Sequence, residues 1–345
     1  MKVGIYFDMR NPPGWRQDAT RLYGFTLEMC QEAERLGADS VWLSEHHLFE
    51  DGYLPQPLTV AAAVAARTSR LRIGTAVLLA PLHAAVEIAE QAAVVDIISG
   101  GRLDLGLGAG YRVPEFELYG SDIVKRYTTN DGRVRELRAL WREGRLTPAP
   151  VQERIPIYLG YQGPKGARRA GLLGEGLLSV SPELTEPYHA ALAEAGHDVP
   201  ATARRAGSLQ GWVTDDPERD WPLVSKHLAY QLDSYRRYMV EGTDQPVPQP
   251  IDPERLIRRA PGQILGSFLY GDPDDVAARI LEYLGDTQVD TLFFWGSLAG
   301  MPDDVVAEAV RTVCADLAPR LRAAGLDSPD LTTYNDRTDR SGGHV

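Results

Sequence analysis

The sequence predicts an α/β protein, a single (β/α)8 barrel of the TIM type with an insertion near the seventh strand that covers the C-terminal mouth. Three observations predict it. Short apolar runs alternate with amphipathic stretches along most of the chain, the length of 345 residues suits one large barrel, and the alternation breaks once, between about 195 and 270. The barrel is expected to occupy 1–325, and the polar tail 327–345, which lacks apolar periodicity, is expected to be disordered.

The first third of the chain reads as repeated strand and helix units. Each expected strand is a short apolar run, and each expected helix has apolar residues at helical spacing or is rich in alanine. The first helix ends at Leu36-Gly37, where glycine suits a helix end. The expected strands are 2–7, 40–45, 70–80 and 102–108, and the expected helices between them are 20–36, 58–69 and 84–99. Alternation of this kind indicates a parallel sheet covered by helices.

The later units have the same form until the insertion. The expected elements are helix 129–143, strand 155–160, helix 164–173 and strand 176–180. A strand is expected at 207–216, followed by a polar, aromatic helix and the proline-rich TDQPVPQPIDP. A helix at 271–284 with Asp272 as its N-cap, a buried last strand at 289–296 and a final helix at 303–323 complete the barrel.

The composition limits the classes of partner and the cellular compartment that we expect. The 36 basic and 48 acidic residues give a net charge of −12, which argues against a nucleic-acid or anionic-membrane binder and favours a small-molecule partner. Only Cys30 and Cys314 are present, without CxxC spacing, so no disulfide framework is expected. No run of membrane-spanning length and no signal peptide are recognised. We therefore expect a cytoplasmic protein with no membrane partner.

The stretch SEHH places His46 and His47 at the end of the second expected strand. Chemistry in such a barrel lies at the C-terminal ends of the strands, so both imidazoles are expected at the mouth. A histidine there transfers protons near neutral pH or binds a cofactor, although one of the pair is equally expected to be a packed loop residue. No metal site is expected, because neither a second histidine pair nor an HExxH spacing is present.

Residues 44–120 resemble the bacterial luciferase-like family of flavin-dependent monooxygenases and oxidoreductases. The resemblance rests on EHH after the second strand, GTAV at the end of the third, and GRLDLGLGAG followed by PEFELYG at the fourth. It implies an eight-stranded barrel that holds reduced FMN, or in one branch the deazaflavin F420, at the C-terminal mouth.

The resemblance also assigns residues around the flavin ring. His46 matches the catalytic histidine and His47 is its neighbour, while the bond from Ala76 to Val77 matches a non-prolyl cis peptide that contacts the ring.

The fourth strand departs from the luciferases. They carry a cysteine and an arginine where this chain has Gly108 and Ala109, which argues against luciferase activity and removes one expected flavin contact. Gly108 still allows a close approach to the ring, although glycines at a strand end also serve packing. Arg112 is close enough in sequence to replace part of the lost contact.

The phosphate of the cofactor is expected at GYQGPKGARRAG. This segment follows a strand and begins a helix, so it presents free N–H groups and a positive helix end. The family holds the flavin phosphate in the matching loop, which implies contacts from Gly160, Tyr161, Gln162, Gly163 and Lys165. The alternative is a solvated helix start.

The resemblance implies a monooxygenase that uses O2 and FMNH2, supplied by a separate NAD(P)H:flavin reductase, to oxygenate a small organic substrate through a C4a-peroxyflavin. It also implies a homodimer. Two alternatives remain: an F420H2-dependent reductase or dehydrogenase, for which Lys165, Arg168 and Arg169 would suit the polyanionic tail, and a non-catalytic flavin-binding barrel. The aromatic residues near the lid either line a substrate pocket or belong to the core; they are Trp212, Trp221, Tyr230, Tyr235, Tyr238 and Trp295.

Overall fold

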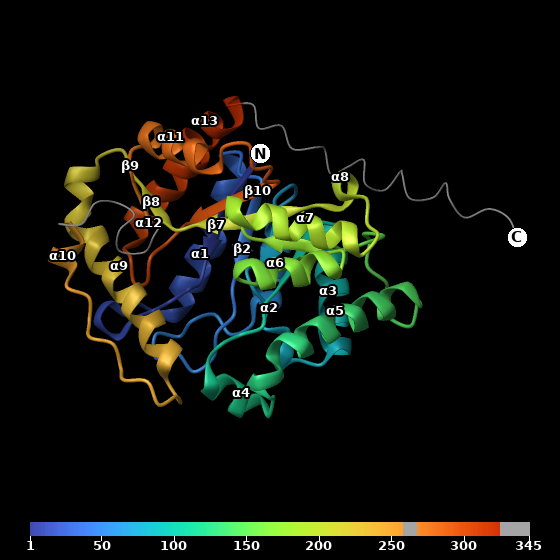
Figure 1. The fold of residues 1–345 in the computed structure, drawn as a ribbon. Coiled ribbons are helices and arrows are strands. Elements are labelled where there is room, and N and C mark those ends of the chain that lie inside the picture. Colours follow the sequence, from blue (N-terminus) through green and yellow to red (C-terminus); the bar gives the residue numbers. More distant parts are fainter. Residues whose placement is uncertain (258–267, 325–345) are drawn as a thin grey trace, which may run out of the picture.

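The computed structural model describes residues 1–257 and 268–324 and contains a closed barrel of parallel strands (Figure 1). Its strands run in the order β1-β10-β7-β6-β5-β4-β3-β2, and β1 pairs with both β10 and β2. The strands are β1 (Lys2–Phe7), β2 (Ser40–Leu43), β3 (Arg72–Thr75), β4 (Leu103–Leu107), β5 (Ile157–Leu159), β6 (Gly176–Leu178), β7 (Arg205–Leu209) and β10 (Thr291–Trp295). The predicted TIM-type barrel is confirmed.

Helices follow the strands, and most of them cover the outside of the barrel. They are α1 (Ala19–Arg35), α2 (Pro57–Arg67), α3 (Ala85–Ser99), α4 (Val113–Tyr119), α5 (Arg126–Arg142), α6 (Gly163–Leu172), α7 (Thr185–Glu194), α8 (Val199–Thr202), α11 (Pro273–Leu284), α12 (Asp303–Arg311) and α13 (Ala318–Ala323). Asp272 accepts hydrogen bonds from Asp274 N and Asp275 N at the start of α11, which confirms it as the N-cap. Among the described residues, no helix is both long enough and apolar enough to cross a bilayer.

The core fills the barrel and the layer under the helices. Every residue of β2, β4 and β10 is buried, because each strand is covered by side chains inside the barrel and by helices outside it. Inside, Trp42 and Phe293 stack with ring centroids 4.6 Å apart, which joins β2 to β10 across the intervening β1. The strand ends above this core are thereby fixed as a frame for the mouth.

Additional elements lie between β7 and β10. They are β8 (Gly211–Val213), α9 (Pro217–Val240), α10 (Pro253–Ile257) and β9 (Leu269–Gly271), with β8 paired to β9. The single strand expected at 207–216 is therefore two strands: β7 closes the barrel, whereas β8 leaves it to pair elsewhere. The insertion expected at 195–270 includes α8 and β7, which belong to the barrel. Residues 258–267 and the tail 327–345 lie outside the described residues.

The helix α9 is attached to the loop that follows β2, at the C-terminal mouth. Tyr238 Oη accepts a hydrogen bond from Glu50 N at 2.8 Å, and the hydroxyls of Tyr235 and Tyr53 are 3.0 Å apart. These contacts place the long helix against the strand ends, as expected for an insertion that covers the mouth.

Candidate active site

The two neighbouring histidines lie in different clusters at the mouth. The His46 ring stacks on Phe49 with centroids 4.8 Å apart and meets the edges of Tyr53 and Tyr111 at 4.8 and 5.2 Å. The His47 ring instead contacts Tyr119 at 4.8 Å. Both histidines are buried. His46 belongs to an aromatic cage formed by Phe49, Tyr53 and Tyr111, whereas His47 belongs to a separate polar cluster.

Glu115 on α4 holds the catalytic candidate His46 in place. Its Oε1 accepts hydrogen bonds from His46 Nδ1 at 2.9 Å and from His47 N at 2.8 Å, while Oε2 has no partner within the described residues. With Nδ1 donating to Glu115, His46 Nε2 faces the hydroxyl of Tyr111 at 3.3 Å. Burial raises the pKa of Tyr111, so its hydroxyl stays protonated. Sequence reasoning missed the role of Glu115, because PEFELYG served there only as a family marker.

Arg112 is buried beside the same loop. Its Nη1 donates to His47 O at 2.6 Å and its Nε donates to Glu241 Oε2 at 3.0 Å, at the end of α9. The guanidinium also lies over the Tyr238 ring, 4.7 Å from its centroid. Arg112 thus joins the histidine loop to the lid helix, and its cofactor contact stays a prediction.

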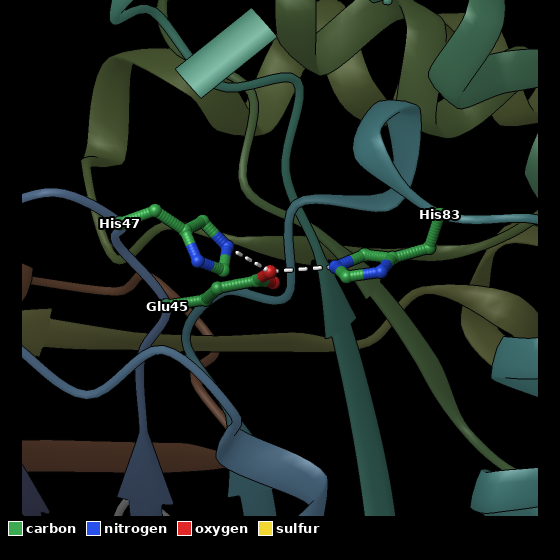
Figure 2. Close-up of side chains that lie close together, drawn as sticks. All are labelled: Glu45, His47 and His83. Atoms are coloured by element: carbon green, nitrogen blue, oxygen red, sulfur yellow. Dashed lines mark hydrogen bonds and ion pairs between the residues drawn. The ribbon is translucent and has the colours of Figure 1, made fainter. Parts of the chain in front are cut away.

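The second cluster contains Glu45, His47 and His83 (Figure 2). Glu45 Oε1 accepts from His47 Nε2 at 2.8 Å and from His83 Nε2 at 2.6 Å. Burial alone would raise the pKa of Glu45, but the hydrogen bonds from the two imidazoles outweigh it and lower that pKa. Burial alone would lower the pKa of His83, and its hydrogen bond to Glu45 raises it instead. His83 was missed because it comes from the segment after β3, far from EHH in sequence.

A third buried group lies at the end of β1. Arg10 Nε donates to Asp51 Oδ2 at 2.9 Å, and the guanidinium lies 4.8 Å from the centroid of Tyr235 on α9. Among the described residues, no donor makes a hydrogen bond of good geometry to either carboxylate oxygen of Asp8. Burial and the nearby Asp51 raise the pKa of Asp8 to about 7 against the opposing effect of Arg10. Nothing in the sequence distinguished Asp8, Arg10 or Asp51.

The peptide bond between Ala76 and Val77 is cis, as predicted. Glycines directly after β4 and β5 leave room for Val77: a Cβ at Gly108 would lie 2.2 Å from Val77 Cγ2, and one at Gly160 would lie 2.5 Å from Val77 Cγ1. Both glycines therefore serve packing around Val77. The cofactor contacts of Ala76, Val77, Gly108 and Gly160 stay predictions.

The predicted phosphate loop forms the start of α6. Gln162 is the N-cap but makes no side-chain cap hydrogen bond, and Gly163 has a positive φ of 69°. The first-turn N–H groups are therefore not capped by Gln162 and fit a phosphate. Lys165 is exposed beside them, whereas the hydroxyl of Tyr161 is buried and donates to Asp131 Oδ1 at 2.6 Å.

The aromatic residues of the lid divide between the site and the core. The Tyr235 ring lies 6.4 Å from His46, and Tyr238 packs on Phe49 at 3.9 Å. The remaining four have other neighbours: Trp221 contacts Tyr270, Trp295 contacts Phe268, Tyr230 contacts Trp15 and Trp212 is buried in β8. Only Tyr235 and Tyr238 of this set are thus placed beside the His46 cage.

A cavity of about 680 Å³ lies at the opposite end of the barrel, where the strands begin. Its lining includes Lys2, Arg72 and Gly176, the first residues of three strands. Arg72 is paired there with Asp104 at 2.6 Å. Because the histidines lie at the other end, this cavity is separate from the candidate active site.

Comparison with known proteins agrees with the fold and the motifs. Residues 1–291 match the family model of the luciferase-like monooxygenases. An F420-dependent glucose-6-phosphate dehydrogenase from Amycolatopsis mediterranei is 27% identical over 328 residues, 87% of this chain and 95% of that protein. The oxygenase component of a flavin-dependent trigonelline monooxygenase from Acinetobacter baylyi is 37% identical over 102 residues, 30% of this chain and 28% of that protein.

The fold likeness extends to a solved flavoprotein. The oxygenating constituent of 3,6-diketocamphane monooxygenase from Pseudomonas putida, solved in complex with FMN, superposes with a TM-score of 0.71 at 19% identity, covering 92% of this chain and 98% of that chain. FMN and F420 enzymes are thus both among the proteins that this chain resembles. With the family model spanning most of the barrel, the chain belongs to the luciferase-like monooxygenase family of enzymes.

Proposed function

We propose that this chain is the oxygenase of a two-component flavin-dependent monooxygenase. It takes FMNH2 from a separate NAD(P)H:flavin reductase and uses O2 to oxygenate a small organic substrate. A reducing cytoplasm is the proposed compartment, where the free, buried thiols of Cys30 and Cys314 persist.

The observation that carries the choice of FMN is the pairing of the basic residues of α6. Arg168 forms an ion pair with Glu194 at 2.5 Å, and Arg169 forms one with Asp131. Both arginines are thereby balanced by acidic partners, which leaves Lys165 and the helix start as the positive groups of α6. A single phosphate matches that charge better than the polyanionic tail of F420 does.

The His46 cage supplies the proton chemistry. Glu115 fixes the imidazole through Nδ1, so Nε2 is the atom that can hold or move a proton at the mouth. The surrounding Phe49 and Tyr53 are buried and exclude water. When bound, reduced FMN supplies the electrons for oxygen activation. His46→Ala should therefore reduce turnover by about 100-fold while the circular dichroism spectrum stays unchanged.

Anaerobic titration of the full chain with FMNH2 and, separately, with F420H2 tests the proposal. We expect saturable FMNH2 binding with at least about tenfold preference over F420H2, a difference of about 1.4 kcal/mol. Lys165→Ala should weaken FMNH2 binding, whereas Arg168→Ala, with its guanidinium already paired to Glu194, should leave it unchanged. Binding of neither cofactor would contradict both enzymatic functions.

The F420H2-dependent dehydrogenase remains the second candidate. Its support is the relative that is 27% identical over 87% of this chain, whereas the trigonelline monooxygenase component matches only 30% of it. A preference for F420H2 in the titration would favour hydride transfer over oxygenation. Flavin binding that leads to no oxidation of any substrate would favour the non-catalytic barrel.

We also propose a homodimer that pairs through α3. Val86, Val94 and Ile98 lie on one row of this helix at spacings of four or eight residues, and each is more than 40% exposed. Ile98→Arg should convert the dimer to a monomer in light scattering. Leu172→Arg replaces a residue of similar exposure on α6 and should leave the dimer intact. A monomeric wild-type protein would contradict the proposal.

A further inference from the structure

The geometry points to a binding site for a divalent first-row transition metal ion, such as Zn²⁺, formed by Glu45, His47 and His83. One donor atom of each residue lies within 4.8 Å of the other two, and the three side chains converge on one point (Figure 2). Two imidazole nitrogens and one carboxylate oxygen form a donor set that binds zinc and related divalent ions. The site is separate from the His46 cage and does not depend on the flavin.

The distances are close to those that a metal requires. In a tetrahedral site with bonds of about 2.0 to 2.1 Å, neighbouring ligand atoms are about 3.3 Å apart. Glu45 Oε1 is now 2.8 Å from His47 Nε2 and 2.6 Å from His83 Nε2. The two pairs that contain Glu45 Oε1 therefore need to separate by about 0.5 to 0.7 Å, whereas the two imidazole ligand atoms, which lie within 4.8 Å of each other, need to come to about 3.3 Å. Small side-chain rotations supply such movements without a change in the backbone.

The backbone of the three ligands is already fixed. His47 N donates to Glu115 at 2.8 Å, and His47 O accepts from Arg112 at 2.6 Å. His83 O accepts from Arg133 Nε at 2.8 Å. Glu45 Oε2 accepts from a backbone N–H at 2.6 Å, which leaves Oε1 to face the imidazoles. Less ordering is therefore needed when an ion binds.

A partner outside the ligand set suits coordination by His47. When Nε2 binds a metal, the ring proton is on Nδ1 and needs an acceptor. The hydroxyl of Tyr119 lies 3.3 Å from His47 Nδ1 and supplies it. This hydrogen bond also fixes the ring orientation.

Space for a further ligand lies on the His83 side. A cavity of about 10 Å³ is lined by Glu45, His83, Glu87 and Gln91 among others. Such a volume holds about one water molecule. His83 is the least buried of the three ligands, so this side also gives the ion its path of entry. A water molecule or the Glu87 carboxylate would complete the coordination.

Metal titration of the full-length protein tests the site. The protein is treated with a chelator, transferred to metal-free buffer and titrated with Zn²⁺ by calorimetry and with Co²⁺ by visible absorbance. We expect one ion per chain and d–d bands from a site of low coordination number. His83→Gln should weaken binding by about tenfold or more. His189→Gln, a half-buried histidine on α7, is the matched control and should bind as the wild type does.

Absence of saturable binding, or equal binding by wild type and folded His83→Gln, would overturn the inference. If His83→Gln does not fold, the X-ray absorption spectrum of Zn²⁺-loaded wild-type protein decides. Two imidazole ligands are expected, and fewer than two would contradict the site. These metal measurements need no flavin, so their outcome is independent of the outcome of the FMNH2 and F420H2 titrations.

Discussion

Replacement of Asp8 by asparagine should make the stability of this protein less dependent on pH. Asp8 is 1% exposed, and its pKa is raised from 3.8 to about 7, mainly by burial. Between these two values the unfolded chain has released the proton and the folded chain still holds it. Stability is therefore lost as the pH rises from about 4 to about 7.

The magnitude follows from the two pKa values. The Asp8 carboxyl ionises more readily in the unfolded chain than in the folded one. Compared with a side chain that stays neutral, this difference lowers the free energy of unfolding by about 2 kcal/mol at pH 5 and by about 4 kcal/mol at pH 8. Asp8→Asn removes this pH-dependent contribution to the free energy of unfolding. The difference in stability between Asp8→Asn and the wild type should therefore grow by about 2 to 3 kcal/mol from pH 5 to pH 8, whatever constant offset the amide introduces.

Urea unfolding at several pH values between 5 and 8 measures this difference. The control is Asp286→Asn, since Asp286 is exposed and its replacement should follow the wild type across the range. A difference between Asp8→Asn and the wild type that stays constant with pH would refute the reasoning. It would mean that Arg10 keeps the Asp8 carboxylate ionised throughout.

Two further predictions concern the site and its frame. Glu115→Gln should lower the oxidation rate of the bound reduced cofactor by about 100-fold and alter its pH profile, since the carboxylate that orients His46 is lost; an unchanged profile would contradict this. Gly108→Ala should cost about 1 to 3 kcal/mol in urea unfolding, because the new Cβ would lie 2.2 Å from Val77 Cγ2. Gly132 is on α5, and apart from its chain neighbours and the helix backbone no atom of the described residues lies within 4 Å of a Cβ there. Gly132→Ala should therefore stabilise by about 0.5 to 1 kcal/mol instead, and equal effects of the two alanines would contradict the steric argument.

Local pattern accounts for the agreement between the expected and observed elements. The first helix was expected at 20–36 and α1 spans Ala19–Arg35, because apolar spacing and a terminal glycine act within a few residues. The single strand expected at 207–216 was wrong, because its division depends on contacts with distant strands. The run GSLQGWVTDD reads locally as one strand, and the position of its pairing partners, β10 for β7 and β9 for β8, divides it.

The sequence by itself determined the alternation of strands and helices, the family resemblance and the place of EHH at the mouth. Only the tertiary structure decided which groups meet there. It brings Glu115 to His46 from the fourth strand-helix unit and His83 to Glu45 from the third. It also pairs Arg168 and Arg169 with acidic residues. Helical and strand periodicity is set by neighbours along the chain, whereas these contacts join residues far apart in sequence and depend on how the closed barrel orders its strand ends.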